Sequence, residues 1–128
     1  MKFVLNRKKH YSPSGFLAEL VSSKYKDTPF KIHSYIVKIN SNWVRAEHYH
    51  KKKEEWIAPV FGKTLLKMKS IKSKKKKECL LDFEDKKQKI IHVPPLWAHS
   101  IKAINGDSAI VVFSLIPENK KDTTPYEL

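Results

Sequence analysis

Apolar and polar residues alternate along much of this chain with the two-residue period that is typical of β-strands. The alternation is clearest in residues 30–39, where His33, Tyr35, Val37 and Ile39 fall on one face that we expect to be buried. No segment has a convincing helical period. The expected strands cover residues 3–5, 16–21, 30–39, 43–50, 55–61, 63–69, 78–83, 89–93, 97–103 and 109–116.

Glycine and asparagine mark two sharp turns between these strands. Gly62 separates residues 55–61 from residues 63–69, and this arrangement predicts a hairpin. Asn-Gly-Asp at residues 105–107 predicts a second hairpin, because Asn-Gly favours a tight turn between paired strands.

Two polar stretches interrupt or follow the strands. Residues 70–77 are rich in lysine and serine and predict a protruding loop, and residues 117–128 form a polar tail that we expect to pack loosely. Many short strands without a fixed repeat favour a sandwich or a barrel over a mixed fold. An antiparallel jelly roll is the best match.

Length and cysteine content limit the class of protein. The chain has 128 residues, so we expect residues 1–128 to form a single domain with its own core. Cys79 is the only cysteine, which excludes an internal disulfide and a paired-cysteine metal site. No apolar run is long enough for a membrane span, and the first residues become charged too soon for a signal peptide. These features predict a cytoplasmic protein with no membrane partner.

Basic residues dominate the charge and give a formal net charge of +13. The lysines gather in short runs such as residues 51–53 and 74–77, rather than along one helical face with aromatic residues between them. We interpret these runs as solvated loops and turns, and we do not expect nucleic acid as a partner. The positive field would still attract an anionic small molecule, such as a phosphorylated sugar.

Histidines and glutamates provide candidate metal ligands. His48 and His50 are two residues apart in an expected strand, so they would lie on the same face. His99 is expected to point inward from a later strand, and Glu54 and Glu55 compete for the place of a carboxylate ligand. Three imidazoles and a carboxylate suit a divalent transition metal with positions open for water or substrate. Alternatively, His99 is a core residue that hydrogen-bonds nearby backbone.

The same residues resemble the paired motifs of the cupin superfamily. The positions that fit the first cupin motif in order and spacing are His48, His50, Glu55 and Gly62. Residues 94–99 (PPLWAH) resemble the second motif. The resemblance implies an antiparallel cupin jelly-roll barrel, and the six-residue gap before Gly62 selects Glu55 over Glu54 as the ligand.

The second motif departs from the cupin pattern. Leu96 stands where the motif usually has glycine, and the asparagine expected four residues after His99 is Ala103, with Asn105 displaced. We therefore expect the turn before His99 to be shaped differently from that of the family.

Within the cupins, the chain is most similar to the dTDP-4-keto-6-deoxyhexose isomerases and epimerases and to the cupin domains of capsular-polysaccharide enzymes. Residues 15–20 resemble their opening segment, residues 45–52 their central segment and residues 124–128 their tail. The resemblance implies an isomerase or epimerase of polysaccharide biosynthesis that acts on a keto-deoxy sugar linked to dTDP or UDP.

The resemblance also implies roles for individual residues. Arg45 matches an arginine that meets the nucleotide diphosphate, and His48 matches the base of some epimerases. A divalent metal, zinc in the first place and nickel, manganese or iron as other options, would be held by His48, His50, Glu55 and His99. A histidine bonded to metal has no free lone pair, so with metal present the proton would pass to Tyr35, His33 or a metal-bound hydroxide.

Other side chains and function classes complete these expectations. His33 is expected to line the cavity or the core, and Trp97 is the best candidate for stacking on a sugar. A metal-dependent small-molecule cupin such as a dioxygenase would use the same ligands, and a binding cupin would have no turnover. We also expect a homodimer, because pairing can cover the edge strands of a small barrel.

Overall fold

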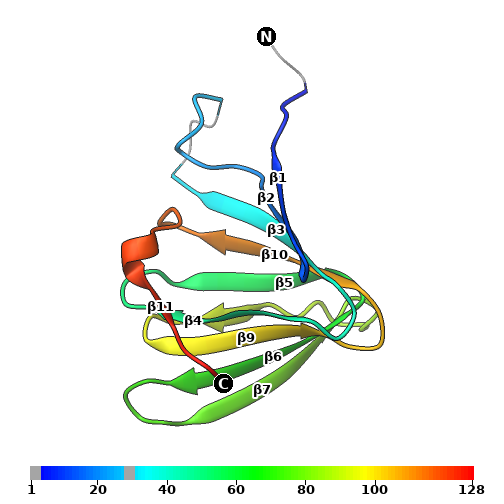
Figure 1. Ribbon diagram of the computed structural model, residues 1–128, viewed down its shortest axis with the longest axis vertical. Helices are drawn as coiled ribbons and strands as arrows, with labels where there is room; N and C mark the ends of the chain where they lie inside the picture. Colours follow the sequence, from blue (N-terminus) through cyan, green and yellow to red (C-terminus); the bar gives the residue numbers. More distant parts are fainter. Residues whose placement is uncertain (1–3, 28–30) are drawn as a thin grey trace.

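The computed structural model describes residues 4–27 and 31–128, and the chain folds into two antiparallel β-sheets that face each other (Figure 1). The six-stranded sheet has the order β1 (Lys9–Ser12), β2 (Gly15–Glu19), β3 (His33–Ile39), β10 (Ser108–Ser114), β5 (Glu55–Phe61) and β8 (Ile91–Val93). The five-stranded sheet has the order β11 (Thr123–Pro125), β4 (Val44–His50), β9 (Trp97–Ala103), β6 (Lys63–Ser70) and β7 (Lys76–Asp82). This architecture confirms the expected all-β jelly roll.

The alternation in the sequence determines which side chains enter the space between the sheets. In β6, Thr64, Leu66 and Met68 are buried while Lys63 and Lys67 are exposed. Burial of every second side chain is the ordinary consequence of the strand's period of two. The core cluster consists of Val37, Ile39, Ile57, Leu66, Met68, Leu81, Val93, Ile101, Ala103, Ile110 and Val112.

The two hairpins expected at Gly62 and at residues 105–107 are wrong, although both turns exist. β5 and β6 belong to different sheets, and so do β9 and β10. Gly62 has φ of +70°, and a Cβ there would lie 2.5 Å from the Asp107 carbonyl oxygen. The β5–β6 connection and the β9–β10 connection, which both pass from one sheet to the other, therefore pack against each other. Turn chemistry is local, whereas the choice of sheet depends on which strands can cover the apolar face.

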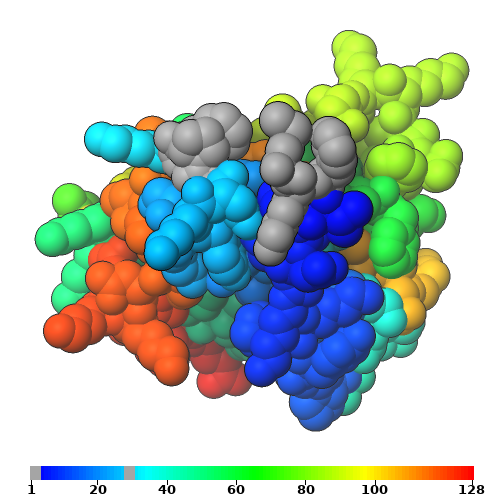
Figure 2. Space-filling view, turned by 90° about the horizontal axis from the view of Figure 1, so that it is seen from above, coloured from blue at the N-terminus to red at the C-terminus, as the bar shows by residue number. Residues whose placement is uncertain are grey.

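The N-terminal part differs from the expected strands. Of the predicted strand at residues 3–5, Phe3 lies outside the described residues, while Val4 and Leu5 are not in a strand. The first strand is instead β1, which forms a hairpin with β2. Seen from above, this blue hairpin and the light-blue loop after it cover one end of the molecule, where the orange C-terminal segment reaches them (Figure 2).

The C-terminal tail is more ordered than the sequence predicts. Residues Lys120–Asp122 form a short 3-10 helix, η1, and β11 pairs with β4 through Thr123, Thr124 and Pro125. The Asp122 carboxylate accepts hydrogen bonds from the backbone N–H groups of residues 51–53 at 3.1 to 3.3 Å. The expectation of loose packing is therefore wrong for this segment, because strand pairing and the hydrogen bonds of Asp122 hold it in place.

Candidate metal centre

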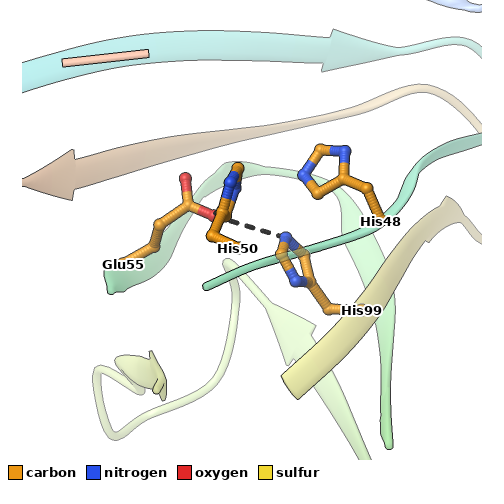
Figure 3. A group of neighbouring side chains, drawn as sticks. All are labelled: His48, His50, Glu55 and His99. Carbon is orange, nitrogen blue, oxygen red and sulfur yellow. Dashed lines mark ion pairs between the residues drawn. The ribbon is translucent and has the colours of Figure 1, made fainter. Parts of the chain in front are cut away.

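Four side chains from three strands meet between the sheets. Figure 3 shows His48 and His50 from β4, Glu55 from β5 and His99 from β9 pointing toward one another. One candidate ligand atom from each lies within 4.8 Å of all the others. His50, Glu55 and His99 are buried, and His48 is half-buried on the side of the cavity. The sequence pattern thus corresponds to one compact cluster.

The hydrogen bonds of two imidazoles leave the same nitrogen free. His99 Nδ1 lies 3.3 Å from the Trp97 carbonyl oxygen, to which it can only donate. His50 Nδ1 lies 3.3 Å from the Thr123 hydroxyl. With Nδ1 protonated, each Nε2 carries a lone pair, and His50 Nε2 is buried with no hydrogen-bond partner among the described residues.

The charge states suit the binding of a cation. Burial alone would raise the pKa of the Glu55 carboxyl, but the neighbouring His50 and His99 rings and the Lys53 ammonium hold this pKa well below its usual range. Burial, together with His99 and His50, lowers the pKa of His48 to about 4. At neutral pH the cluster therefore offers a carboxylate and a neutral His48 imidazole.

Both the donor set and its geometry fit a divalent metal ion. Glu55 Oε1 lies 3.4 Å from His50 Nε2 and 3.3 Å from His99 Nε2, so one oxygen faces both free lone pairs. Glu54 instead points to the surface, where its carboxylate lies 2.6 Å from His92. Imidazole with one carboxylate suits zinc, iron, nickel or manganese better than calcium. The orphaned nitrogen of His50 is the clearest sign that a ligand completes the cluster.

A small cavity opens beside the cluster. It has a volume of about 130 Å³, and Tyr35, Arg45, His48, Glu55 and His99 contribute its polar groups. The rest of its wall is mainly apolar side chains of the core, with Glu118 at one side. A few polar groups in an apolar pocket are typical of small-molecule sites.

A β-bulge places Arg45 in this cavity. Arg45 is three residues before His48, so uninterrupted alternation would put the two side chains on opposite faces of β4. The register of β4 on β9 shifts between Ala46 and His48, and Ala46 and Glu47 have φ of 72° and 53°. The extra residue returns Arg45 to the inner face, where its Nη1 donates to the Ser12 and Ser14 hydroxyls.

Tyr35 lines the cavity beside the cluster. Its hydroxyl donates a hydrogen bond to Glu55 Oε2. Burial, and then the charge of Glu55 and this hydrogen bond, raises the pKa of Tyr35 well above its usual value. Tyr35 therefore keeps its proton at neutral pH, which does not suit the expected role of taking a proton from the substrate.

Lys53 is a site residue that the sequence reasoning missed. It was placed in a solvated run, yet it is only 2% exposed, and its Nζ lies 3.6 Å from Glu55 Oε2 and 2.8 Å from Glu118 Oε2. The interpretation of residues 51–53 as a solvated loop is thus wrong for Lys53. Its two carboxylate partners offset the cost of burying the ammonium group.

Two other expected site residues lie outside the cavity. The buried His33 ring hydrogen-bonds Ser22 at 2.8 Å and lines a second cavity of about 120 Å³, which shares Tyr35 and Glu118 with the first. Trp97 is not among the residues that line either cavity, and its ring instead faces the Lys77 ammonium at 5.9 Å. The structure therefore brings Tyr35 and Arg45 to the cluster, but not His33 or Trp97.

The turn before His99 keeps a conformation that favours glycine, although Leu96 occupies it. Leu96 has φ of 65°, and its N–H donates to the His50 carbonyl oxygen at 2.7 Å. Its own carbonyl accepts from Ile71 at 2.9 Å. These two hydrogen bonds hold Leu96 in the left-handed region, which glycine adopts more readily than leucine.

The double-sheet fold and the paired motifs define this chain as a cupin. The family model for the polysaccharide biosynthesis C-terminal domain matches residues 10–124. The chain belongs to this family. A search of curated protein sequences returned no match.

Solved structures share the fold at low sequence identity. The capsular polysaccharide assembling protein CapF from Staphylococcus aureus matches with a TM-score of 0.84 and 16% identity over 98% of this chain and 33% of CapF. Oxalate decarboxylase from Bacillus subtilis matches with a TM-score of 0.79 and 15% identity over 94% of this chain and 30% of that protein. The chain thus spans about a third of the length of each structure.

No helix formed by the described residues is long and apolar enough to cross a membrane.

Proposed function

We propose that this protein binds a divalent metal ion through His48, His50, Glu55 and His99 and acts on a nucleotide-linked keto-deoxy sugar in polysaccharide biosynthesis. The observation that carries the proposal is the convergence of these four side chains on one point, beside an inner cavity that Arg45 also lines. Membership of a polysaccharide-biosynthesis family supports a sugar-related substrate. Zinc is the metal that we favour, with nickel, manganese or iron as alternatives.

The cavity supports a division of the substrate into an inner sugar and an outer nucleotide. A volume of about 130 Å³ accommodates a sugar ring but not a whole sugar nucleotide. Arg45 Nη1 is held by Ser12 and Ser14, and its other two nitrogens make no hydrogen bond with the described residues. These free donors suit the diphosphate of a dTDP- or UDP-sugar, because guanidinium binds phosphate oxygens in pairs.

The chemistry of such a substrate is removal of a proton next to a carbonyl group. A bound metal ion would supply Lewis-acid polarisation of the substrate oxygen. His48 is neutral at pH 7 and could accept a proton only while its lone pair is not engaged as a ligand. Tyr35 keeps its proton at neutral pH and holds Glu55 through its hydroxyl, so it is better suited to positioning the carboxylate than to proton transfer. His33, in the neighbouring cavity, and Trp97, outside both cavities, are less suited to contact the sugar ring.

Deuterium exchange tests the proposed reaction. Purified protein, analysed for its metal content, is incubated with dTDP-4-keto-6-deoxyglucose in deuterated water. The proposal predicts incorporation of deuterium at a ring carbon, with loss of incorporation in His48→Gln protein. Absence of deuterium in the presence of bound metal would contradict the isomerase or epimerase reaction.

A metal-dependent oxygenase is the second candidate, because three histidines and one carboxylate would serve it as well. Oxygen uptake without deuterium incorporation would favour this class. Calorimetric binding of dTDP-sugar without either reaction would favour a binding cupin. A protein that ignored nucleotides but bound DNA with a steep salt dependence would contradict the sugar-nucleotide proposal.

We further propose that residues 1–128 act as one domain in the cytoplasm and pair as a homodimer. The outer strands of both sheets, such as β1 and β7, have one neighbour each and so offer edges that a second copy can cover. Light scattering at micromolar concentration tests the dimer, and a monomeric mass would contradict it.

A further inference from the structure

The C-terminal segment, residues 117–125, touches the candidate metal centre through its side chains. Glu118 contacts Lys53, Asp122 contacts the loop of residues 51–53, and Thr123 contacts His50. We infer that this segment positions the ligands, with Thr123 orienting His50 and Glu118 orienting Glu55 through Lys53. The inference rests on the proposed binding of a metal ion.

Thr123 sets the hydrogen-bonding direction of the His50 ring. Its hydroxyl has one hydrogen, which the Glu118 carboxylate at 3.1 Å or the Asn119 carbonyl at 3.0 Å can accept. The hydroxyl is therefore left to accept the hydrogen of His50 Nδ1, at 3.3 Å. This arrangement keeps the lone pair on Nε2, the buried nitrogen that faces Glu55.

Glu118 and Lys53 select which oxygen of Glu55 is free. Lys53 Nζ and the Tyr35 hydroxyl both contact Oε2 of Glu55. Oε1 remains directed at His50 and His99. Glu118, 2.8 Å from Lys53, fixes the ammonium group in this place. The carboxylate is thus held so that one oxygen, rather than both, faces a bound ion.

Asp122 restrains the loop between two of the ligands. Residues 51–54 connect His50 to Glu55, and three successive N–H groups of this loop donate to the one Asp122 carboxylate. The spacing of His50 and Glu55 therefore depends on a residue near the end of the chain. Restraint of this kind reduces the reorganisation that is needed when an ion binds.

Thr124 provides a matched control for Thr123. Both residues pair with β4, at Tyr49 and at His50 respectively, but no hydrogen bond links the Thr124 side chain to the described residues of the metal centre. A valine at either position has the same shape as threonine and the same strand propensity, so the two variants differ chiefly in the bond to His50.

The test is metal affinity, measured by competition with a chromophoric chelator for zinc and cobalt ions. Because the outer partners of metal-bound histidines typically contribute 10- to 100-fold to affinity, we expect Thr123→Val to weaken binding by about 10-fold. Thr123→Ser should stay within about 2-fold of the original protein, since it keeps the hydroxyl, and Thr124→Val should be unchanged. The visible spectrum of bound cobalt should shift in Thr123→Val but not in Thr123→Ser or Thr124→Val.

A second variant guards against misfolding of the first. Glu118→Gln keeps the size of the side chain but loses the charge that holds Lys53, and it should also weaken metal binding, whereas the surface variant Glu54→Gln should not. Unchanged affinity and cobalt spectra in both Thr123→Val and Glu118→Gln would overturn the inference. If the original protein takes up no metal ion, the proposed metal centre fails, and the inference fails with it.

Discussion

Two runs of lysine look alike in the sequence and differ in the structure. Residues 51–53 form a loop whose three N–H groups are bound by Asp122, and Lys53 is buried between Glu55 and Glu118. Residues 74–77 lie at the end of the β6–β7 hairpin, and all four side chains are exposed. Asp122 and Glu118, the partners that distinguish the first run, are 69 and 65 positions from Lys53, which is about half the length of the chain. The role of a charged run thus depends on residues that no local pattern contains.

The largest expected effect is the difference in the free energy of unfolding between substitutions in the two lysine runs. Lys53→Met leaves the Glu55 and Glu118 carboxylates without their shared cation, so we expect a loss of about 3 kcal/mol in the free energy of unfolding. Urea denaturation of the metal-free protein measures it. Lys75→Met, in the exposed run, should change stability by less than about 0.5 kcal/mol. Equal losses in the two variants would contradict the comparison.

Acid sensitivity should come from the buried cluster and not from the exposed run. The pKa of His48 is lowered to about 4 in the folded chain, against 6.5 for an ordinary histidine, so the unfolded chain binds the extra proton between these values. Stability of the metal-free protein is therefore full above pH 6.5 and falls toward pH 4, by about 2 to 3 kcal/mol.

His48→Gln should remove the larger part of this dependence between pH 6.5 and pH 4, and His33, whose pKa burial also lowers, should account for the remainder. The depressed pKa of Glu55 adds a loss only at the acid end of the range, because its unfolded value is near 4.5. His92→Gln, which changes an exposed histidine, is the control. Denaturation curves at a series of pH values would refute the assignment if His92→Gln, rather than His48→Gln, abolished the slope.

A smaller effect is expected from reversing a charge in the exposed run. Lys69 and Lys76 are directly opposite each other in β6 and β7. Lys76→Glu replaces a like-charge pair by an opposite-charge pair, so it should stabilise the protein by about 0.2 to 1 kcal/mol. The gain should shrink at high salt, because exposed charges are screened. Destabilisation measured at low salt would show that Lys76 has a partner of its own.

The smallest effect is spectroscopic and involves two tyrosines. A hydrogen bond from Lys69, together with the charges of Lys69, Lys74 and Lys76, lowers the pKa of Tyr126, whereas burial raises that of Tyr35. An alkaline titration followed by tyrosinate absorption should show Tyr126 ionising before Tyr35. Lys69→Met should move the Tyr126 transition upward, and Lys86→Met should leave it unchanged. Identification of the tyrosines by Phe substitution completes the test.

The sequence was informative wherever the physics is local. The alternation in β3 and β6 correctly identified buried faces, because the period of a strand does not depend on its partners. The pairing of strands could not be obtained in this way. Gly62 and residues 105–107 specify sharp turns, but which sheet receives the next strand depends on contacts across the whole domain.

In the candidate site, too, residues close in sequence were predictable and long-range contacts were not. The spacing of His48, His50 and Glu55 was sufficient to place them near one another, since a strand and a short loop connect them. Lys53 was assigned to solvent because its partner Glu118 is 65 positions away, and Thr123 was not considered because it is 73 positions from His50. No pattern within either neighbourhood signals these contacts.

The bulge at Ala46 and Glu47 shifts the inward–outward alternation of β4 by one residue. His48 and His50, which follow the bulge, point to the inner face, and Arg45, which precedes it, points to the same face. Loss of one residue at the bulge would restore a regular strand and leave all three side chains in frame. Loss or gain of one residue between His48 and His50 would put the two imidazoles on opposite faces. Among relatives of this chain, loss of one residue at the bulge should therefore be tolerated, whereas a change of one residue between His48 and His50 should be excluded.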